Sequence, residues 1–159
     1  MERVNVILNH PVFTRSLMRL SELEADRVFC RHGIEHLLDV ARIAHILNLE
    51  SEKKAFPKDL VYAAALLHDI GRARQYEDGT PHEKESADLA KIILSDCGFD
   101  ESESKIIIDA ILLHRTSNKG EKTVFAEHIF RADKFSRRCC DCVKFNECSW
   151  ELKNGWVEY

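Results

Sequence analysis

The chain has 159 residues, of which 45% are hydrophobic and 31% charged, and its formal net charge is −4 at pH 7. This length and composition are typical of one globular domain with a sizeable core, and they exclude a disordered or fibrous protein. The acidic balance argues against general electrostatic binding to nucleic acid. It is compatible with a small anionic substrate at a site that supplies its own cations.

The sequence contains no segment that predicts targeting or membrane insertion. Residues 1–8 are too short and too interrupted by charge for a signal peptide, and the longest apolar run, residues 61–67, cannot span a membrane. We therefore expect a cytoplasmic protein without a membrane partner, as a monomer or homodimer.

Apolar residues recur at helical spacing along most of the chain, and no segment shows sustained strand-like alternation. The sequence predicts an all-α bundle of about five to seven helices. The first predicted helix covers residues 11–26 and the second residues 33–47, with a core stripe of Leu37, Val40, Ala41, Ala44 and Leu47. Pro57 suits the first turn of a third helix that ends at residue 67.

After the third helix, Gly71 is expected to turn the chain in a left-handed conformation, and the polar residues 72–81 predict a loop. A fourth helix is predicted over residues 82–95. A fifth runs from a cap at Asp100 or Ser102 to His114, residues 116–122 form a loop, and a sixth helix covers residues 124–136. We expect one domain over residues 1–138, with residues 139–159 as a cysteine-rich appendage packed on it.

His68 and Asp69 stand at the end of a predicted helix that is apolar almost all round, which indicates burial. A buried, ionised aspartate is costly unless it is paired or binds a metal. A metal site therefore competes with a simpler reading, in which His68 is hydrogen-bonded and Asp69 caps the helix.

Asp133 presents the same problem, because its helical neighbours Ala126, Ile129 and Phe130 are apolar. Aspartate is rarely buried without a partner. The alternative to a metal here is a salt bridge to one of the nearby cations, which are Arg131, Lys134, Arg137 and Arg138.

Several histidines accompany these aspartates. His36 shares a helix face with Val40 and Leu47, and His114 ends a stripe of apolar residues. His82 opens a predicted helix. His32 lies one turn before His36, where it would line the same pocket as a ligand support or proton carrier or, more simply, lie at the surface or behind the ligands. One histidine on an apolar face is usually a core residue, but several inward-facing ligands on separate helices are how helical folds build metal sites. His10, His45 and His128 lack such company and are read as structural or solvated.

The order His36, His68-Asp69 and Asp133, each on its own helix, resembles the HD-domain superfamily of metal-dependent phosphohydrolases. The segments around the three positions, residues 36–41, 66–72 and 131–134, look like the family's motifs, and the likeness covers residues 27–138. It implies a helical fold and hydrolysis of phosphate esters or anhydrides, with a nucleotide as the expected substrate. His82 and His114 fall where the dinuclear branch has two extra histidines, so the resemblance implies a second metal bridged by Asp69. The Gly-Tyr-Pro segment usual in cyclic-dinucleotide phosphodiesterases is absent, which argues against that substrate class.

The resemblance gives the remaining site residues their expected roles. Imidazole and carboxylate ligands suit iron, which we expect first, or manganese, nickel or zinc. A bound metal lowers the pKa of its water, and Asp69 is expected to lie at the centre of this catalytic site. Fixed cations then stabilise developing charge on phosphate. The candidates for these cations are Arg72, Lys134 and Arg137, each of which is also a plausible surface residue.

Four of the six cysteines stand close together in the sequence, at positions 139, 140, 142 and 148. The spacing of Cys139, Cys142 and Cys148 is typical of a partial zinc or iron–sulfur ligand set. The alternative is a group of reduced thiols packed with Trp150 and Trp156. Cys30 and Cys97 are expected to be buried apolar-like residues.

Two other functions share much of this pattern. A binding module could keep the HD fold, with or without the metal, to sense a ligand without turnover. Such a module would be expected to lose ligands, and all six are present. A dinuclear iron oxygenase uses an overlapping ligand set. Hydrolysis is favoured by the superfamily as a whole and by the cations near Asp69 and Asp133.

Overall fold

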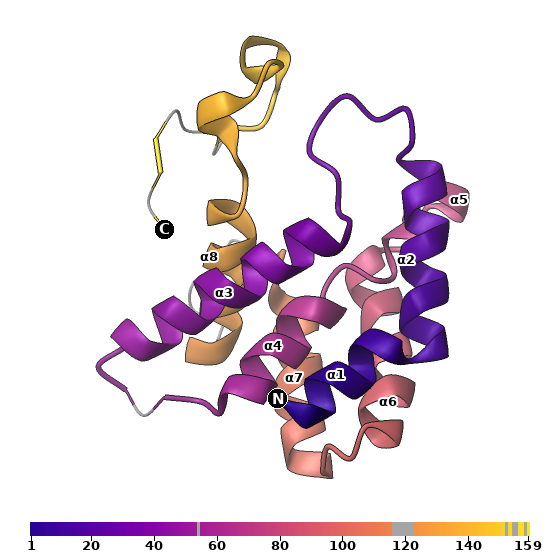
Figure 1. Cartoon of the computed structure of the whole chain (residues 1–159), viewed down its shortest axis with the longest axis vertical. Helices are drawn as coiled ribbons and strands as arrows, with labels where there is room; N and C mark the ends of the chain where they lie inside the picture. Colours follow the sequence, from indigo (N-terminus) through magenta and orange to yellow (C-terminus); the bar gives the residue numbers. More distant parts are fainter. Residues whose placement is uncertain (54, 116–122, 152, 154–155, 158) are drawn as a thin grey trace.

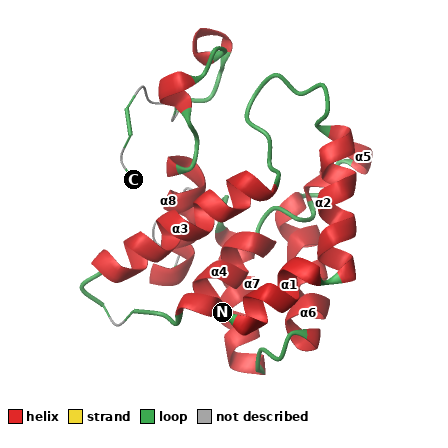
Figure 2. Cartoon of the chain, viewed as in Figure 1, coloured by secondary structure: helices red, strands yellow, loops and turns green. Residues whose placement is uncertain are grey.

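All regular structure in the computed structural model is helical over the residues that it describes, which are 1–53, 55–115, 123–151, 153, 156–157 and 159 (Figure 2). No strand occurs in this part of the chain, so the predicted all-α class is confirmed. In chain order the helices are α1 (Glu2–Asn9), α2 (Pro11–Leu23), α3 (Ile34–Glu50), α4 (Lys58–Leu67), α5 (Arg72–Asp78), α6 (His82–Asp96), α7 (Glu101–Leu113) and α8 (Val124–Phe135).

Helix α4 lies at the centre of the fold. It contacts α1, α3, α6, α7 and α8, and every residue from Ala63 to Leu67 is buried. A helix of alanine and leucine without a polar face has to be enclosed by other helices to remove its apolar surface from water. The end of this helix is therefore a deeply buried position from which polar side chains can emerge.

The remaining helices enclose α4 in a way that brings distant segments together. Helix α3 crosses in front of α4 and α8, and packs against both (Figure 1). Helix α7 contacts α4, α6 and α8. The predicted core stripe of α3, from Leu37 to Leu47, is buried as expected. The ends of α4, α6 and α7 and the inner faces of α3 and α8 thus border one interior region.

Two predictions about where helices lie are wrong. Residues 2–9 form α1, where no helix was predicted, and residues 72–78 of the predicted loop form α5. Helix α5 has no apolar stripe, but its residues are mostly good helix formers, and Arg74 Nε pairs with Asp78 Oδ2 at 2.6 Å in the i,i+4 arrangement. Gly79, with φ of 81°, ends the helix.

Gly71 does not adopt the predicted left-handed conformation, since its φ is −84°. Its role is to allow close packing. A Cβ atom at this position would lie 2.4 Å from the backbone nitrogen of Ser86 on α6, and the Gly71 amide donates a hydrogen bond to Ser86 Oγ at 2.9 Å. The turn after His68 and Asp69 is therefore pressed against α6.

The C-terminal segment is less regular than the bundle. Its described part holds two short 3₁₀ turns, η1 (Cys139–Asp141) and η2 (Phe145–Glu147), and stands beyond the end of α8 (Figure 1). The Tyr159 ring contacts Phe135 with 5.2 Å between centroids. The division at residue 138 remains a prediction, and the predicted loop 116–122 lies outside the described residues. None of the described helices is long and apolar enough to cross a membrane.

Candidate metal centre

The six predicted ligands converge on the interior region at the end of α4. His36 lies on α3, Asp133 on α8 and His82 at the start of α6, while His68 and His114 follow α4 and α7 directly. All are buried, from 0% exposure for His68 to 8% for His36. Helix packing, not sequence proximity, therefore assembles this cluster.

Four side chains form the first group, with their potential ligand atoms all within 4.8 Å of one another: His36, His68, Asp69 and Asp133. His36 Nε2 lies 3.4 Å from Asp133 Oδ1, and His68 Nε2 lies 3.5 Å from Asp69 Oδ2. Ligands bound to one transition metal at about 2.1 Å are about 3 to 3.5 Å apart. The spacing of these atoms thus suits a shared ion.

Asp69, His82 and His114 form a second group of the same kind. His82 Nε2 lies 3.0 Å from Asp69 Oδ1, and His114 Nε2 lies 3.6 Å from the same oxygen. Asp69 turns its other oxygen, Oδ2, toward the first group. Its carboxylate is therefore placed to belong to both groups.

The four histidines are all fixed in the same sense. Nδ1 of His68 donates to the Ala65 carbonyl, and Nδ1 of His114 donates to the Ile111 carbonyl, both at 2.6 Å. A proton held on Nδ1 leaves the Nε2 lone pair available, which is the form that binds metals.

The other two histidines are anchored by side chains. His82 Nδ1 is bonded to Gln75 Oε1. His36 Nδ1 lies 3.1 Å from Ser136 Oγ, which itself donates to the Asp133 carbonyl and so is free to accept. Gln75 and Ser136 were not predicted. Gln75 lay in a segment read as a loop, and the sequence offers no signal that pairs residue 136 with residue 36.

Three atoms of the cluster are buried without a hydrogen-bond partner: His36 Nε2, His68 Nε2 and Asp69 Oδ1. Leaving a buried polar atom unsatisfied typically costs about 1–3 kcal/mol. Elsewhere in the described part of the chain only Nδ1 of His45 and of His128 share this condition. Divalent cations would satisfy these atoms, one at the first group for the two Nε2 atoms and one at the second group for Asp69 Oδ1, so the donor set fits metal ions.

The electrostatics of the metal-free cluster keep both aspartates ionised and the His36 ring neutral. Burial alone raises the pKa of Asp69, but His68 and Arg72 outweigh it and hold that pKa well below its ordinary value. The pKa of Asp133 is likewise held low, chiefly by Arg137. Burial lowers the pKa of His36 to about 4. Ionised carboxylates and neutral imidazoles are the forms that ligate metals.

The three predicted cations all contact the ligand carboxylates. Arg72 Nη2 lies 3.1 Å from Asp69 Oδ2, while Arg137 Nη2 lies 2.8 Å and Lys134 Nζ 2.5 Å from oxygens of Asp133. Carboxylate oxygens can accept a hydrogen bond and bind a cation through separate lone pairs. In this arrangement the three cations orient and neutralise the aspartates at the edge of the cluster.

His32 is buried behind His36 and not at the surface, which were its two simpler predicted placements. It is 3% exposed, and its Nδ1 lies 2.6 Å from Oε1 of the buried Glu24. Tyr76 Oη donates to the same oxygen at 2.7 Å, and the His32 ring meets the edge of His36. Burial raises the pKa of Glu24, but bonding to His32 outweighs this and lowers it to about 2. Helical periodicity could not predict Glu24 as the partner of His32, because the two residues meet through the irregular connection between α2 and α3.

The cysteines do not form a comparable cluster. Within the described residues, no metal-binding group contains a thiol, so Cys139, Cys142 and Cys148 are not assembled as a ligand set. Cys139 is buried and lines a cavity of about 340 Å³ with Trp150 and Trp156. Cys97 is buried as expected, but the prediction for Cys30 is wrong, because the connection between α2 and α3 leaves it exposed.

The chain has relatives among known proteins. A protein of Clostridium beijerinckii, described as an uncharacterized protein, is 46% identical over 161 residues that cover the full length of both chains. Ribonuclease Y of Oleidesulfovibrio alaskensis is 31% identical over 130 residues, which are 80% of this chain but 22% of that protein. No solved structure matches significantly. The family model of the HD domain matches residues 33–138, which include all six residues of the two groups, and the chain therefore belongs to the HD-domain family.

Proposed function

We propose that the chain is a metal-dependent phosphohydrolase that cleaves a phosphate ester or anhydride of a nucleotide or similar small compound. One observation carries this proposal: four buried histidines have Nδ1 engaged and Nε2 close to Asp69, Asp133 or both. Membership of the HD-domain family supports it. A relative named for ribonuclease activity is consistent with hydrolysis at phosphorus.

In this proposal His36, His68, Asp69 and Asp133 hold one ion, and His82 and His114 hold a second that shares Asp69. Iron is the metal we propose first, although manganese, nickel and zinc suit the same ligands. When bound, the metal supplies a water of lowered pKa as the nucleophile.

The remaining residues act on the ligands and on the phosphate. Ser136 and Gln75 fix the rings of His36 and His82. Arg72, Lys134 and Arg137 keep the aspartates ionised, and they bring positive charge to the edge of the site, where it would stabilise charge on a transferring phosphoryl group. Cations that hold the aspartates in place do not need to move, and their short ion pairs with the carboxylates are compatible with this role.

The test is phosphate release by the full chain after metal removal and reloading with iron(II), manganese(II), nickel(II) or zinc(II) in turn. Nucleoside mono-, di- and triphosphates and dinucleoside polyphosphates form the substrate panel. We expect release only with a reloaded metal, and we expect Asp133→Asn to abolish it. The matched control is Asp88→Asn, which alters an exposed carboxylate on α6.

Two results would contradict the proposal and identify its alternatives. Bound metal with no turnover of any phosphate substrate would favour a ligand-sensing module. Bound iron with oxygen consumption, but no phosphate release, would favour an oxygenase.

A further inference from the structure

A cleft of about 800 Å³ adjoins the metal centre. Its walls come from α2, from the connection between α2 and α3, from the first turn of α3 and from the segment after α8. His36 and Arg137, which belong to the metal centre, also line it. The cleft therefore reaches the first ligand group, and its volume is within the range of about 300–1,000 Å³ typical of small-molecule sites.

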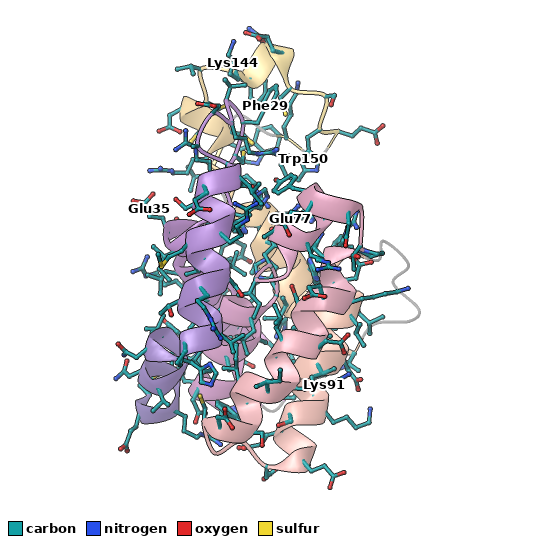
Figure 3. All side chains as sticks on the ribbon, turned by 90° about the vertical axis from the view of Figure 1, so that its right-hand side faces the viewer. Phe29, Glu35, Glu77, Lys91, Lys144 and Trp150 are labelled. Carbon is teal, nitrogen blue, oxygen red and sulfur yellow. The ribbon has the colours of Figure 1, made fainter. Side chains whose placement is uncertain are left out.

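One wall of the cleft is apolar and unusually exposed. Val28, Phe29 and Ile34 line it with 62%, 38% and 39% of their surface accessible. Figure 3 shows Phe29 at the end of the molecule that also carries Lys144 and Trp150 of the C-terminal segment. An exposed phenyl ring bordered by aliphatic side chains is suited to stacking against a planar ring.

Cations line the same cleft, but most of them are already engaged. Arg31 Nη2 donates to the Ala25 carbonyl and Arg27 Nε to the Cys30 carbonyl, both at 2.8 Å, so these two hold the connection together. Arg137 pairs with Asp133. Arg138 is exposed and forms no hydrogen bond or ion pair with any described residue. Its guanidinium group is available for a phosphate.

Acidic residues limit what the cleft can accept. Glu35, Asp39 and Asp141 also lie in its lining, so it does not present a continuous positive surface. A long polyanion would meet these carboxylates and be repelled. One phosphate group beside Arg138 avoids that cost, which favours a small ester over a nucleic acid.

The connection between α2 and α3, which carries Phe29, is held in place by the buried Glu24. Glu24 accepts hydrogen bonds from the His32 backbone amide at 2.7 Å and from Tyr76 at 2.7 Å, besides its contact with the His32 ring. Glu24 and His32 are both buried. The apolar wall is thus preorganised, so a ligand need not order it on binding.

We propose that this cleft is the substrate pocket, that it takes a nucleoside monophosphate or a similar phosphate ester with one planar ring, and that Phe29 stacks on the ring while Arg138 binds the phosphate. The proposal rests on the proposed function for the chemistry at the adjoining metal centre. Phe29 is then the residue that determines specificity for the ring, and Arg138 acts on any phosphate ester.

Calorimetric titration of the metal-loaded full chain with two probes tests this. Adenosine 5′-monophosphate and ribose 5-phosphate carry the same phosphate and differ by the base. We expect the parent to bind the nucleotide at least about tenfold more tightly, because stacking contributes on that scale. Phe29→Ala should remove most of this preference and leave the affinity for ribose 5-phosphate within about twofold, while Arg138→Ala should weaken both probes alike.

The controls are Leu49→Ala and Arg15→Ala, which alter exposed residues outside the cleft. Both should bind like the parent, and all variants should keep its metal content and melting temperature. Equal binding of the two probes by the parent, or equal effects of Phe29→Ala on both, would overturn the pocket assignment even if the chain hydrolyses phosphate esters. Phe29-dependent nucleotide binding without any turnover would instead leave the pocket standing and contradict the proposed function.

Discussion

Two regions of this chain carry metal-binding side chains, and only one of them is assembled. The histidines and aspartates of the metal centre lie up to 97 positions apart, from residue 36 to residue 133, yet their ligand atoms meet in two buried groups. The cysteines lie within ten positions, from residue 139 to residue 148, and form no such group in the described structure.

The difference lies in the elements that carry the side chains. Each ligand of the metal centre stands on, or directly after, a helix packed against α4 or its neighbours. The cysteines stand on and around 3₁₀ turns of three residues, which fix little beyond themselves. A ligand set needs rigid supports and second partners for each ligand, and proximity in sequence does not replace them.

The largest effect is expected from removing Asp69, the residue shared by both ligand groups. Asp69→Ala takes a ligand from each group and leaves Arg72 without its partner. We expect metal content to fall to background and phosphate release to fall below detection. Elemental analysis and the phosphate assay check this, with Asp88→Ala as the control for loss of an exposed carboxylate. Full metal content together with full turnover would refute the site.

In the metal-free chain, lowering the pH should reduce the free energy of unfolding, because ligand histidines are buried. The pKa of His36 falls from 6.5 to about 4 on folding because the ring is buried, so only the unfolded state takes up this proton between these values. The free energy of unfolding should therefore fall as pH decreases from 6.5 to 4, by up to about 3 kcal/mol for this residue. Burial also lowers the pKa of His32 and His82, which adds to the slope. His68 subtracts from it, because Asp69 and Asp133 outweigh burial and raise its pKa.

Urea unfolding at pH 7, 5.5 and 4 measures this effect. In a His36→Gln variant the slope over that window should be shallower, by up to one proton. The aspartates keep their lowered pKa in the folded state, so they add to the loss of stability only near pH 4, where the unfolded carboxyls take up protons, and they do so in both proteins. Identical slopes in the parent and the variant would show that His36 is not buried as a neutral ring.

A smaller effect is expected where the turn of the metal centre is pressed against α6. Gly71→Ala places a Cβ atom 2.4 Å from the Ser86 backbone nitrogen and 2.8 Å from the carbonyl carbon of Glu85. Backbone cannot yield as a side-chain end does, so we expect a loss of about 1–3 kcal/mol. Gly33→Ala is the matched control, since nothing lies within 4 Å of its Cβ. Thermal unfolding with equal loss in both variants would contradict this account.

Removing the cysteines of the C-terminal segment is expected to have no effect on the metal centre. A Cys139→Ser/Cys142→Ser/Cys148→Ser variant should retain the metal content of the parent and its phosphate release, because none of these thiols belongs to a ligand group. Elemental analysis checks this directly. A loss of one zinc or several iron ions per chain would show that the C-terminal segment binds metal after all.

The features that could be predicted from the sequence include those in which a polar side chain stands among apolar neighbours. Asp133 within an apolar stripe and Asp69 after an apolar helix both demanded a partner, and both lie in the cluster. The stripe of α3 and a helix cap at Asp100, one of the two predicted candidates, likewise follow from local pattern, and both are present. These features depend on a few neighbouring residues, so the sequence contains them.

Features that depend on packing between distant segments were not predictable in the same way. Helix α5 lacks an apolar stripe, and its Gln75 reaches His82 only because the turn at Gly71 brings α5 beside α6. Glu24 meets His32 through a connection of irregular conformation. No periodicity encodes either contact, and both partners of each pair are common surface residue types.

The two-group arrangement of the metal centre is tested by the metal content per chain in the parent and in a His82→Ala/His114→Ala variant. The double variant removes two of the three members of the second group and leaves the first group complete. After purification without chelator and reloading, we expect about two transition-metal ions per chain in the parent and about one in the variant. An equal number in both proteins, or none in the parent, would contradict the two-group arrangement.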